Sequence, residues 1–301
     1  MTEATTTDRE TGQVVLSRWL GSKKFRTNSV KLLAYVVVTA GAFVLLIPFF
    51  WMLSTSVKPL AQAFAHPPVW IPIPPQWGNY IEAWNALPFN RFFLNSLFIT
   101  IFGMAAEILS CAIVAYGFAR FRFPGRNALF IILLSTMMLP WVVRLIPGFM
   151  IWRNFKLVNT FDPLVVGALF AWGPVNVFII RQFMMGIPLE IEEAARIDGA
   201  NVFQIFTRIM LPLVRPALLA VAVLTFGGFW NNFLGPLIYL NDMQKYTLTL
   251  GMFFFLGGPN EPPKWHWLMA MSTVMIIPVL AVFFMGQRYF IEGITLTGLK
   301  G

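Results

Sequence analysis

Long apolar runs alternate with short polar segments along almost the whole chain. A helix that spans a bilayer needs about 20 mostly apolar residues, and backbone groups in lipid must be satisfied within the segment, which favours helix. Six runs meet or approach that length. The pattern therefore predicts an all-α membrane protein with six transmembrane helices, at Leu32–Leu53, Phe93–Phe118, Ala128–Val143, Pro163–Ile180, Pro216–Leu240 and Trp265–Met285.

The composition agrees with this pattern. Of the 301 residues, 57% are hydrophobic and only 12% are charged, whereas soluble domains carry about 25% charged residues. We expect one six-span domain over residues 31–290, between an N-terminal tail at 1–30 and a C-terminal tail at 291–301.

The distribution of basic residues predicts the orientation. An even number of spans puts both termini on one side, and that side carries fifteen of the 22 lysines and arginines. Cytoplasmic loops carry the excess of basic residues, so both termini are predicted to be cytoplasmic. This asymmetry accounts for the net charge of +9, and we do not expect nucleic-acid binding.

A polar island separates the fourth and fifth apolar runs and predicts two short helices that meet at a glycine. Pro188 suits the first turn of a helix, and Glu190, Glu192 and Glu193 suit its positive end. Gly199 is the residue type that ends a helix in the left-handed conformation.

The second short helix has a start signal and an apolar stripe. Asn201 and Gln204 have the spacing of a capping box. Phe203, Phe206 and Met210 follow at helical spacing, which predicts that they share one face.

The island resembles the EAA signature of ABC importer permeases, EAA-x3-G-x9-I-x-LP. Every fixed position is met, by Glu193-Ala194-Ala195, Gly199, Ile209 and Leu211-Pro212. Several constrained positions at fixed spacing make a strong motif. Further segments are similar to the carbohydrate-importer branch, namely Asn95-Ser96, Ala115–Arg120, Ile187-Pro188, Trp230-Asn231 and Tyr246–Leu248.

The resemblance implies a type I ABC importer permease fold in the prokaryotic cytoplasmic membrane. It implies a second homologous permease, two ATPase subunits and an extracytoplasmic sugar-binding protein as partners. The island would be the coupling helix, with Glu193, Ala194, Ala195 and Gly199 at the ATPase and with Ile209, Leu211 and Pro212 closing the motif. Without the motif, an amphipathic helix in the headgroups would explain the island equally well.

The chain itself is not expected to hydrolyse ATP. It contains no Gly-Lys dipeptide, so a phosphate-loop motif is absent. No cofactor or metal is expected either, since His66 and His266 fall in separate external loops.

Polar groups within the fifth run are the candidate substrate site. Trp230, Asn231 and Asn232 lie between Gly227-Gly228 and Gly235-Pro236, a pattern that suggests a broken helix lining a cavity. An aromatic ring can stack on a sugar and amides can bond its hydroxyls. Interhelical packing is the alternative. Glu107, an acid well inside a span, is expected to have a structural partner rather than to relay protons.

The sequence thus favours the permease subunit of an ATP-driven sugar importer, with an oligosaccharide as the favoured substrate. A type I permease for glycerol phosphate or another polyol stays open, although the predicted spans offer no fixed cation for a phosphate. The alternative from a different class of protein is a channel that works without an ATPase.

Overall fold

The structure is a computed structural model that describes residues 23–258 and 261–298. Within these ranges it contains helices and no strands. Two compact units divide at Ser54, and each is described by itself.

The first unit consists essentially of helix α2, Lys23–Ser56, which contains Pro48. Residues 27–56 are long and apolar enough to cross a membrane. The first predicted span is therefore confirmed, and its helix begins nine residues before the predicted boundary, within the predicted tail. Residues 1–22 of that tail lie outside the described residues.

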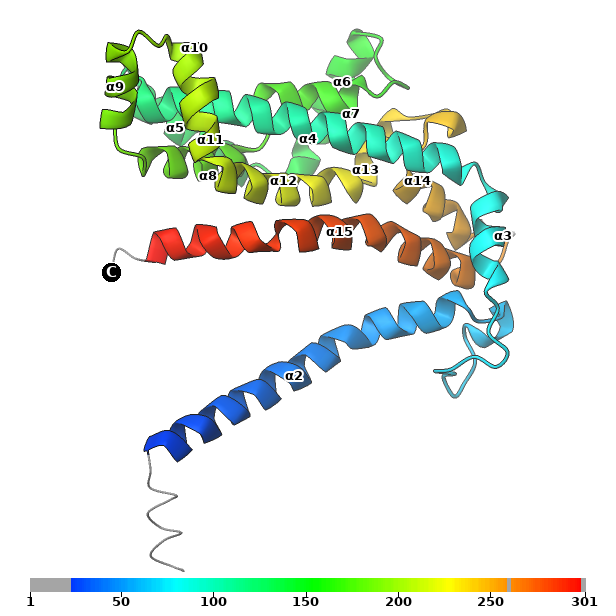
Figure 1. Cartoon of the computed structure of the whole chain (residues 1–301). Coiled ribbons are helices and arrows are strands. Elements are labelled where there is room, and N and C mark those ends of the chain that lie inside the picture. The colour runs from blue at the N-terminus through cyan, green and yellow to red at the C-terminus, as the bar shows by residue number, and fades with distance from the viewer. Residues whose placement is uncertain (1–22, 259–260, 299–301) are drawn as a thin grey trace, which may run out of the picture. The chain divides into compact units, whose positions relative to one another are not determined.

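The second unit is organised around helix α4, Phe89–Arg120, which packs against α8, Pro174–Met185, and against α12, Arg215–Trp230. Helix α12 also packs along α15, Trp265–Gly298 (Figure 1). Small residues allow this closeness. A Cβ atom on Gly103 would lie 2.5 Å from the ring of Phe229, so α4 and α12 meet with no space for a larger residue.

Short helices complete the unit. They are α3 (Gly78–Ala86), α5 (Arg126–Ser135), α6 (Leu145–Asn154), α7 (Asp162–Val165), α9 (Glu190–Ile197), α10 (Val202–Gln204), α11 (Leu211–Leu213), α13 (Leu234–Tyr239) and α14 (Leu248–Phe253). Seven further turns are 3₁₀ or π: η1 (Leu60–Gln62), η2 (Thr136–Met138), η3 (Trp141–Arg144), η4 (Val166–Phe170), η5 (Ile205–Met210), η6 (Met243–Lys245) and η7 (Phe254–Leu256).

The third predicted span is not the single helix over Ala128–Val143 that the apolar run suggested. Helix α5 and turn η2 end before Pro140, and the segment from Trp141 to Asn154 bends away by 98°. Proline lacks the backbone N–H and restrains the preceding residue, which accounts for a break at this point. The membrane segment therefore extends eleven residues beyond its predicted end and includes Arg144.

The other spans agree better with the prediction. Counted within the described residues, four helices are long and apolar enough to cross a membrane, or six if each of two bent pairs is one span. The fourth comprises α7, η4 and α8, over Asp162–Met185. The fifth ends its first helix at Trp230 and resumes at Leu234. In the sixth, α15 continues through most of the predicted C-terminal tail, and residues 299–301 lie outside the described ones.

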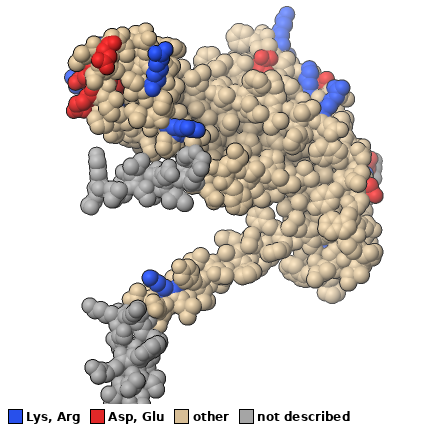
Figure 2. Space-filling model, in the orientation of Figure 1, with Lys and Arg blue, Asp and Glu red and all other residues tan. Residues whose placement is uncertain are grey.

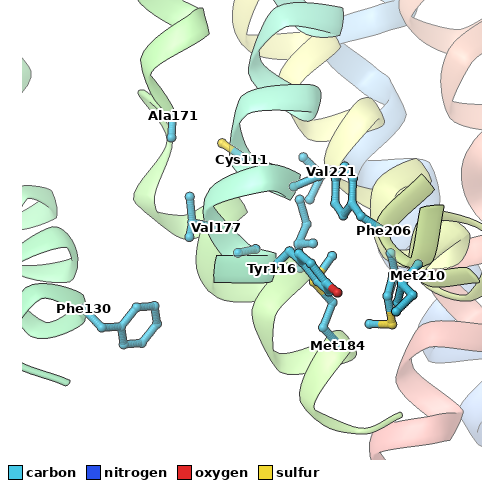
Figure 3. Packing of buried hydrophobic residues seen from close by; sticks show 14 residues of the cluster. Cys111, Tyr116, Phe130, Ala171, Val177, Met184, Phe206, Met210 and Val221 are labelled. Atoms are coloured by element: carbon cyan, nitrogen blue, oxygen red, sulfur yellow. The ribbon is translucent and has the colours of Figure 1, made fainter. Parts of the chain in front are cut away.

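A buried cluster ties the spans to the polar island. Cys111 and Tyr116 of α4, Val177 and Met184 of α8, and Met210 of η5 contribute to it (Figure 3). Because one cluster includes both the spans and the island, the island is packed onto the helix ends rather than hanging free.

Charged side chains of the second unit gather at the two ends of its helices. Figure 2 shows a broad band without visible charge between them. An uncharged band between charged ends is the surface expected of a protein embedded in a bilayer, since charge in lipid is costly.

Candidate functional site

The island forms the predicted helix, glycine elbow and second helix. Glu190, Glu192 and Glu193 occupy the first turn of α9, where they oppose the positive end of the helix dipole. Gly199 has φ +86°, the left-handed conformation that glycine adopts without strain. The motif therefore encodes a sharp turn between α9 and the following helix.

The capping box is also confirmed. The Asn201 side chain accepts from the Gln204 backbone N–H at 2.9 Å, and the Gln204 side chain accepts from the Asn201 N–H at 2.8 Å. Helix α10 continues into the π-helical turns of η5 and then α11. Pro188 lies one residue before the N-cap of α9, Leu189, rather than in the first turn.

One predicted member of the apolar stripe is misplaced. Phe206 and Met210 are buried, but Phe203 is 73% exposed. The physical reason is the π-helical geometry of Ile205–Met210, since a wider turn rotates later residues away from the face that 3.6-residue spacing predicts. Ile205 is buried instead.

A buried ion pair fixes α9 to the end of α4. Glu192 has no exposed surface, and its carboxylate pairs with the guanidinium of Arg120. The Tyr116 hydroxyl donates to the same carboxylate at 3.3 Å, and Arg196 lies 3.6 Å from it. Arg120 also donates to the backbone carbonyl of Ile187 at 2.9 Å.

This pairing was not predicted as part of the site. Sequence reasoning assigned Glu192 to the helix dipole and used Arg120 only as part of a family motif. A signal existed in the sequence, because an arginine at the end of one span and three acids in the next polar island can meet if the segments are adjacent.

The seven motif residues divide into two groups. Glu193, Ala194, Gly199 and Pro212 are exposed. Ala195, Ile209 and Leu211 are partly buried against the cluster of α4 and α8. The exposed group adjoins two large apolar side chains that face outward, Ile197 at 87% and Phe203 at 73% exposed.

The three residues at the break in span five have different surroundings. Trp230 is 1% exposed, its indole N–H donates to the Met275 carbonyl at 3.0 Å, and its ring stacks on Phe226. This is the environment that the packing alternative describes. Asn231 is exposed and donates to the Gly227 carbonyl at 2.9 Å.

Asn232 lines a cavity of about 230 Å³. Its side-chain oxygen accepts from the Gly235 N–H at 3.0 Å, and Gly235 also lines the cavity. The predicted broken helix beside a cavity is therefore confirmed at Asn232. Glu107 reaches the same cavity and, as predicted, has a structural partner, since it accepts from the Asn176 amide at 2.7 Å.

Comparison with known proteins now identifies the class. The family model described as binding-protein-dependent transport system inner membrane component matches residues 107–295. The chain belongs to this family, and it is a permease component of a binding-protein-dependent ABC transport system.

Three curated relatives extend the comparison. Arabinooligosaccharides transport system permease protein AraQ of Halalkalibacterium halodurans is 38% identical over 69% of this chain and 74% of its own length. Diacetylchitobiose uptake system permease protein NgcG of Streptomyces coelicolor is 31% identical, over 85% and 84%. sn-Glycerol-3-phosphate transport system permease protein UgpE of Yersinia enterocolitica is 30% identical, over 89% and 96%.

A solved structure shares the fold. It is a chain of a bacterial ABC transporter involved in the import of the acidic polysaccharide alginate, with a TM-score of 0.77 and 24% identity over 89% of this chain and 98% of that one. The type I importer permease fold expected from the sequence is confirmed.

Proposed function

We propose that this chain is one of two homologous permease subunits of an ATP-driven importer of a sugar, most suitably an oligosaccharide. Two ATPase subunits lie below the pair, and an extracytoplasmic binding protein delivers the sugar. Support comes from the family and from relatives named for arabinooligosaccharides and diacetylchitobiose. Both termini are cytoplasmic, and ATP is hydrolysed only by the ATPase subunits.

The exposed apolar edge of the island carries the coupling part of this proposal. Ile197 of α9 and Phe203 of α10 are exposed on an island that is otherwise anchored, and large apolar residues exposed on a surface indicate a site of interaction. We infer that they enter the ATPase subunit, together with Glu193, Ala194, Ala195 and Gly199. Ile209, Leu211 and Pro212 support this edge from behind.

Coupling of the ATPase to transport needs a rigid connection between the island and the membrane spans. The ion pair between Glu192 and Arg120 would supply it, because it joins α9 to the end of α4 and would pass a displacement of α9 to that helix. Helix α4 carries Glu107 to the cavity. Movement driven by the ATPase would therefore reach the cavity wall through one continuous helix.

Cysteine cross-linking tests the docking surface. The natural Cys111 is fully buried, so Phe203→Cys introduces a thiol that reagents reach selectively. We expect it to cross-link to an ATPase subunit in the native complex. Asn241→Cys, an exposed site beyond the far end of span five, is the matched control. If Phe203→Cys forms no cross-link to an ATPase subunit in the native complex, the docking proposal is overturned.

Vesicle uptake tests the transport function. Vesicles that contain the whole complex should accumulate a labelled neutral oligosaccharide only with ATP and the binding protein present. Uptake that persists without the ATPase subunits would favour the channel. Uptake of glycerol phosphate but no sugar would favour the polyol permease, for which the relative UgpE is the supporting observation.

The lining of the cavity removes one objection to the glycerol phosphate alternative. The sequence suggested that no fixed cation lies within the spans, which disfavoured a phosphate. Arg144 belongs to the broken third span and lines the cavity, so that argument was wrong. Of the predicted substrate residues, Asn232 is the one we propose to contact sugar, while Asn231 lies beside it and Trp230 supports the wall.

A further inference from the structure

The cavity beside the broken third and fifth spans contains two opposite charges. Glu107 approaches from α4, and Arg144 from η3. Within the described part of the chain, the ion pairs of 4.0 Å or less are both formed by Glu192, so none joins Glu107 to Arg144. Both residues thus line the cavity without a direct ion pair between them.

The immediate partners of the two groups leave bonding capacity free. Glu107 accepts one hydrogen bond, from Asn176, although a carboxylate can accept several. The Arg144 guanidinium lies 5.1 Å from the centre of the Trp172 ring, and its Nε atom is buried without a hydrogen-bond partner. An ionisable residue at membrane depth is costly and by default suggests function.

The rest of the wall is aromatic and amide. Trp141, Trp152 and Trp172 line the cavity together with Asn232. Flat rings offer a stacking surface for the apolar face of a sugar, while the charged and amide groups offer donors and acceptors. Few polar groups in a mainly apolar pocket are typical of a small-molecule site.

From this arrangement we propose that the cavity is a subsite of this subunit for one uncharged sugar ring, whose hydroxyls bridge Glu107 and Arg144. A hydroxyl can donate to the carboxylate, and another can accept from the guanidinium. This inference rests on the proposed sugar-import function and assigns its substrate class.

The mixed charge selects against acidic substrates. A carboxylate or phosphate in the cavity is attracted by Arg144 and repelled by Glu107, so the two contributions oppose each other. The cost of removing the anion from water is then not offset. An uncharged ring avoids that cost and still makes charge-assisted hydrogen bonds.

The test compares half-saturation of uptake in vesicles that contain the whole complex. The probes are a labelled neutral disaccharide and the corresponding uronic acid disaccharide. Arg144→Gln and Glu107→Gln should each raise the half-saturation concentration for the neutral sugar about tenfold, which corresponds to about 1.4 kcal/mol. Because every variant uses the same binding protein, its own selectivity cancels in the ratio to wild type.

The relative uptake of the two probes distinguishes a residue that contacts substrate from one that only supports packing. Glu107→Gln leaves Arg144 as the cavity's remaining charge, so it should improve uptake of the uronic acid relative to the neutral sugar. Arg144→Gln should do the reverse. A purely structural role predicts equal loss for both probes.

Controls distinguish the possible failures. Arg153→Gln changes an exposed arginine of α6 that does not line the cavity and should behave as wild type. Gly148→Leu fills the cavity from α6 without removing a charge, so it should reduce sugar uptake even if Glu107→Gln fails to assemble. Unchanged half-saturation in Arg144→Gln and Gly148→Leu would overturn the subsite. Absence of any sugar uptake in wild type would instead overturn the proposed function.

Discussion

Two groups of charged residues in this protein differ in whether their opposite charges form an ion pair. At the end of α4, Arg120 and Glu192 are both buried and paired, with Tyr116 and Arg196 adding contacts. In the cavity, Glu107 and Arg144 lie apart and retain unused bonding capacity. A buried charge that is satisfied within the chain holds structure, whereas one that is not satisfied is available to a ligand.

The largest effect is expected from breaking the paired group. Arg120→Met leaves the buried Glu192 with the exposed Arg196, 3.6 Å away, as its remaining cation, and loss of a buried partner costs about 3–5 kcal/mol. Transport should be lost, and recovery of the ATPase with the permease should fall. Copurification and vesicle uptake measure the two losses.

The control for that prediction removes both charges. Arg120→Met combined with Glu192→Leu should recover assembly in large part, because an apolar pair leaves no uncompensated charge. An Arg120→Met protein with normal assembly and normal transport would show that the pair does not hold α9.

The next largest effect concerns packing at the break in span five. Trp230→Ala removes a fully buried side chain, and truncations of this kind cost about 3–5 kcal/mol. We expect less permease in the membrane and a lower thermal stability in detergent. A matched Trp230→Phe variant should lose less, since it keeps the ring contacts and gives up mainly the hydrogen bond to Met275.

Substitution of Gly199 at the elbow should reduce transport more than it reduces folding or insertion. Among the residues that the structure describes, no atom lies within 4 Å of a Cβ placed on Gly199, but left-handed backbone costs other residues about 1–2 kcal/mol. Gly199→Asp should insert normally and lose transport, because a charged side chain enters the docking surface. Gly199→Asn tolerates the left-handed conformation and separates backbone strain from charge. Full transport by Gly199→Asp with ATPase bound would contradict the prediction.

The smallest effect is expected at Asn231, which lies beside the cavity and bonds only the preceding helical turn. Asn231→Leu should change uptake modestly while the ATPase stays bound. Asn232→Leu should change it more, since Asn232 lines the cavity. Equal kinetics for Asn231→Leu and wild type would assign this residue to packing alone.

Much of the site was predictable because its signals are local. The left-handed Gly199, the capping box at Asn201 and the acidic start of α9 each depend on residues a few positions apart. Local backbone chemistry of this kind can be read from spacing alone. The helical register beyond Gln204 could not, because the π-helical turns depend on how Phe206 and Met210 pack.

The sequence by itself determined that the chain crosses the membrane in apolar helices, that a glycine elbow lies between the fourth and fifth spans, and which residues form the motif. Bilayer thickness and backbone hydrogen bonding impose helices on apolar runs of spanning length, and the elbow and the motif depend on local residue spacing. Only the tertiary structure decided that Arg120 meets Glu192, that Trp230 is covered, and that Arg144 and Glu107 line the same cavity. These arrangements bring together residues that are far apart in the sequence, so they depend on how the helices pack rather than on spacing along the chain.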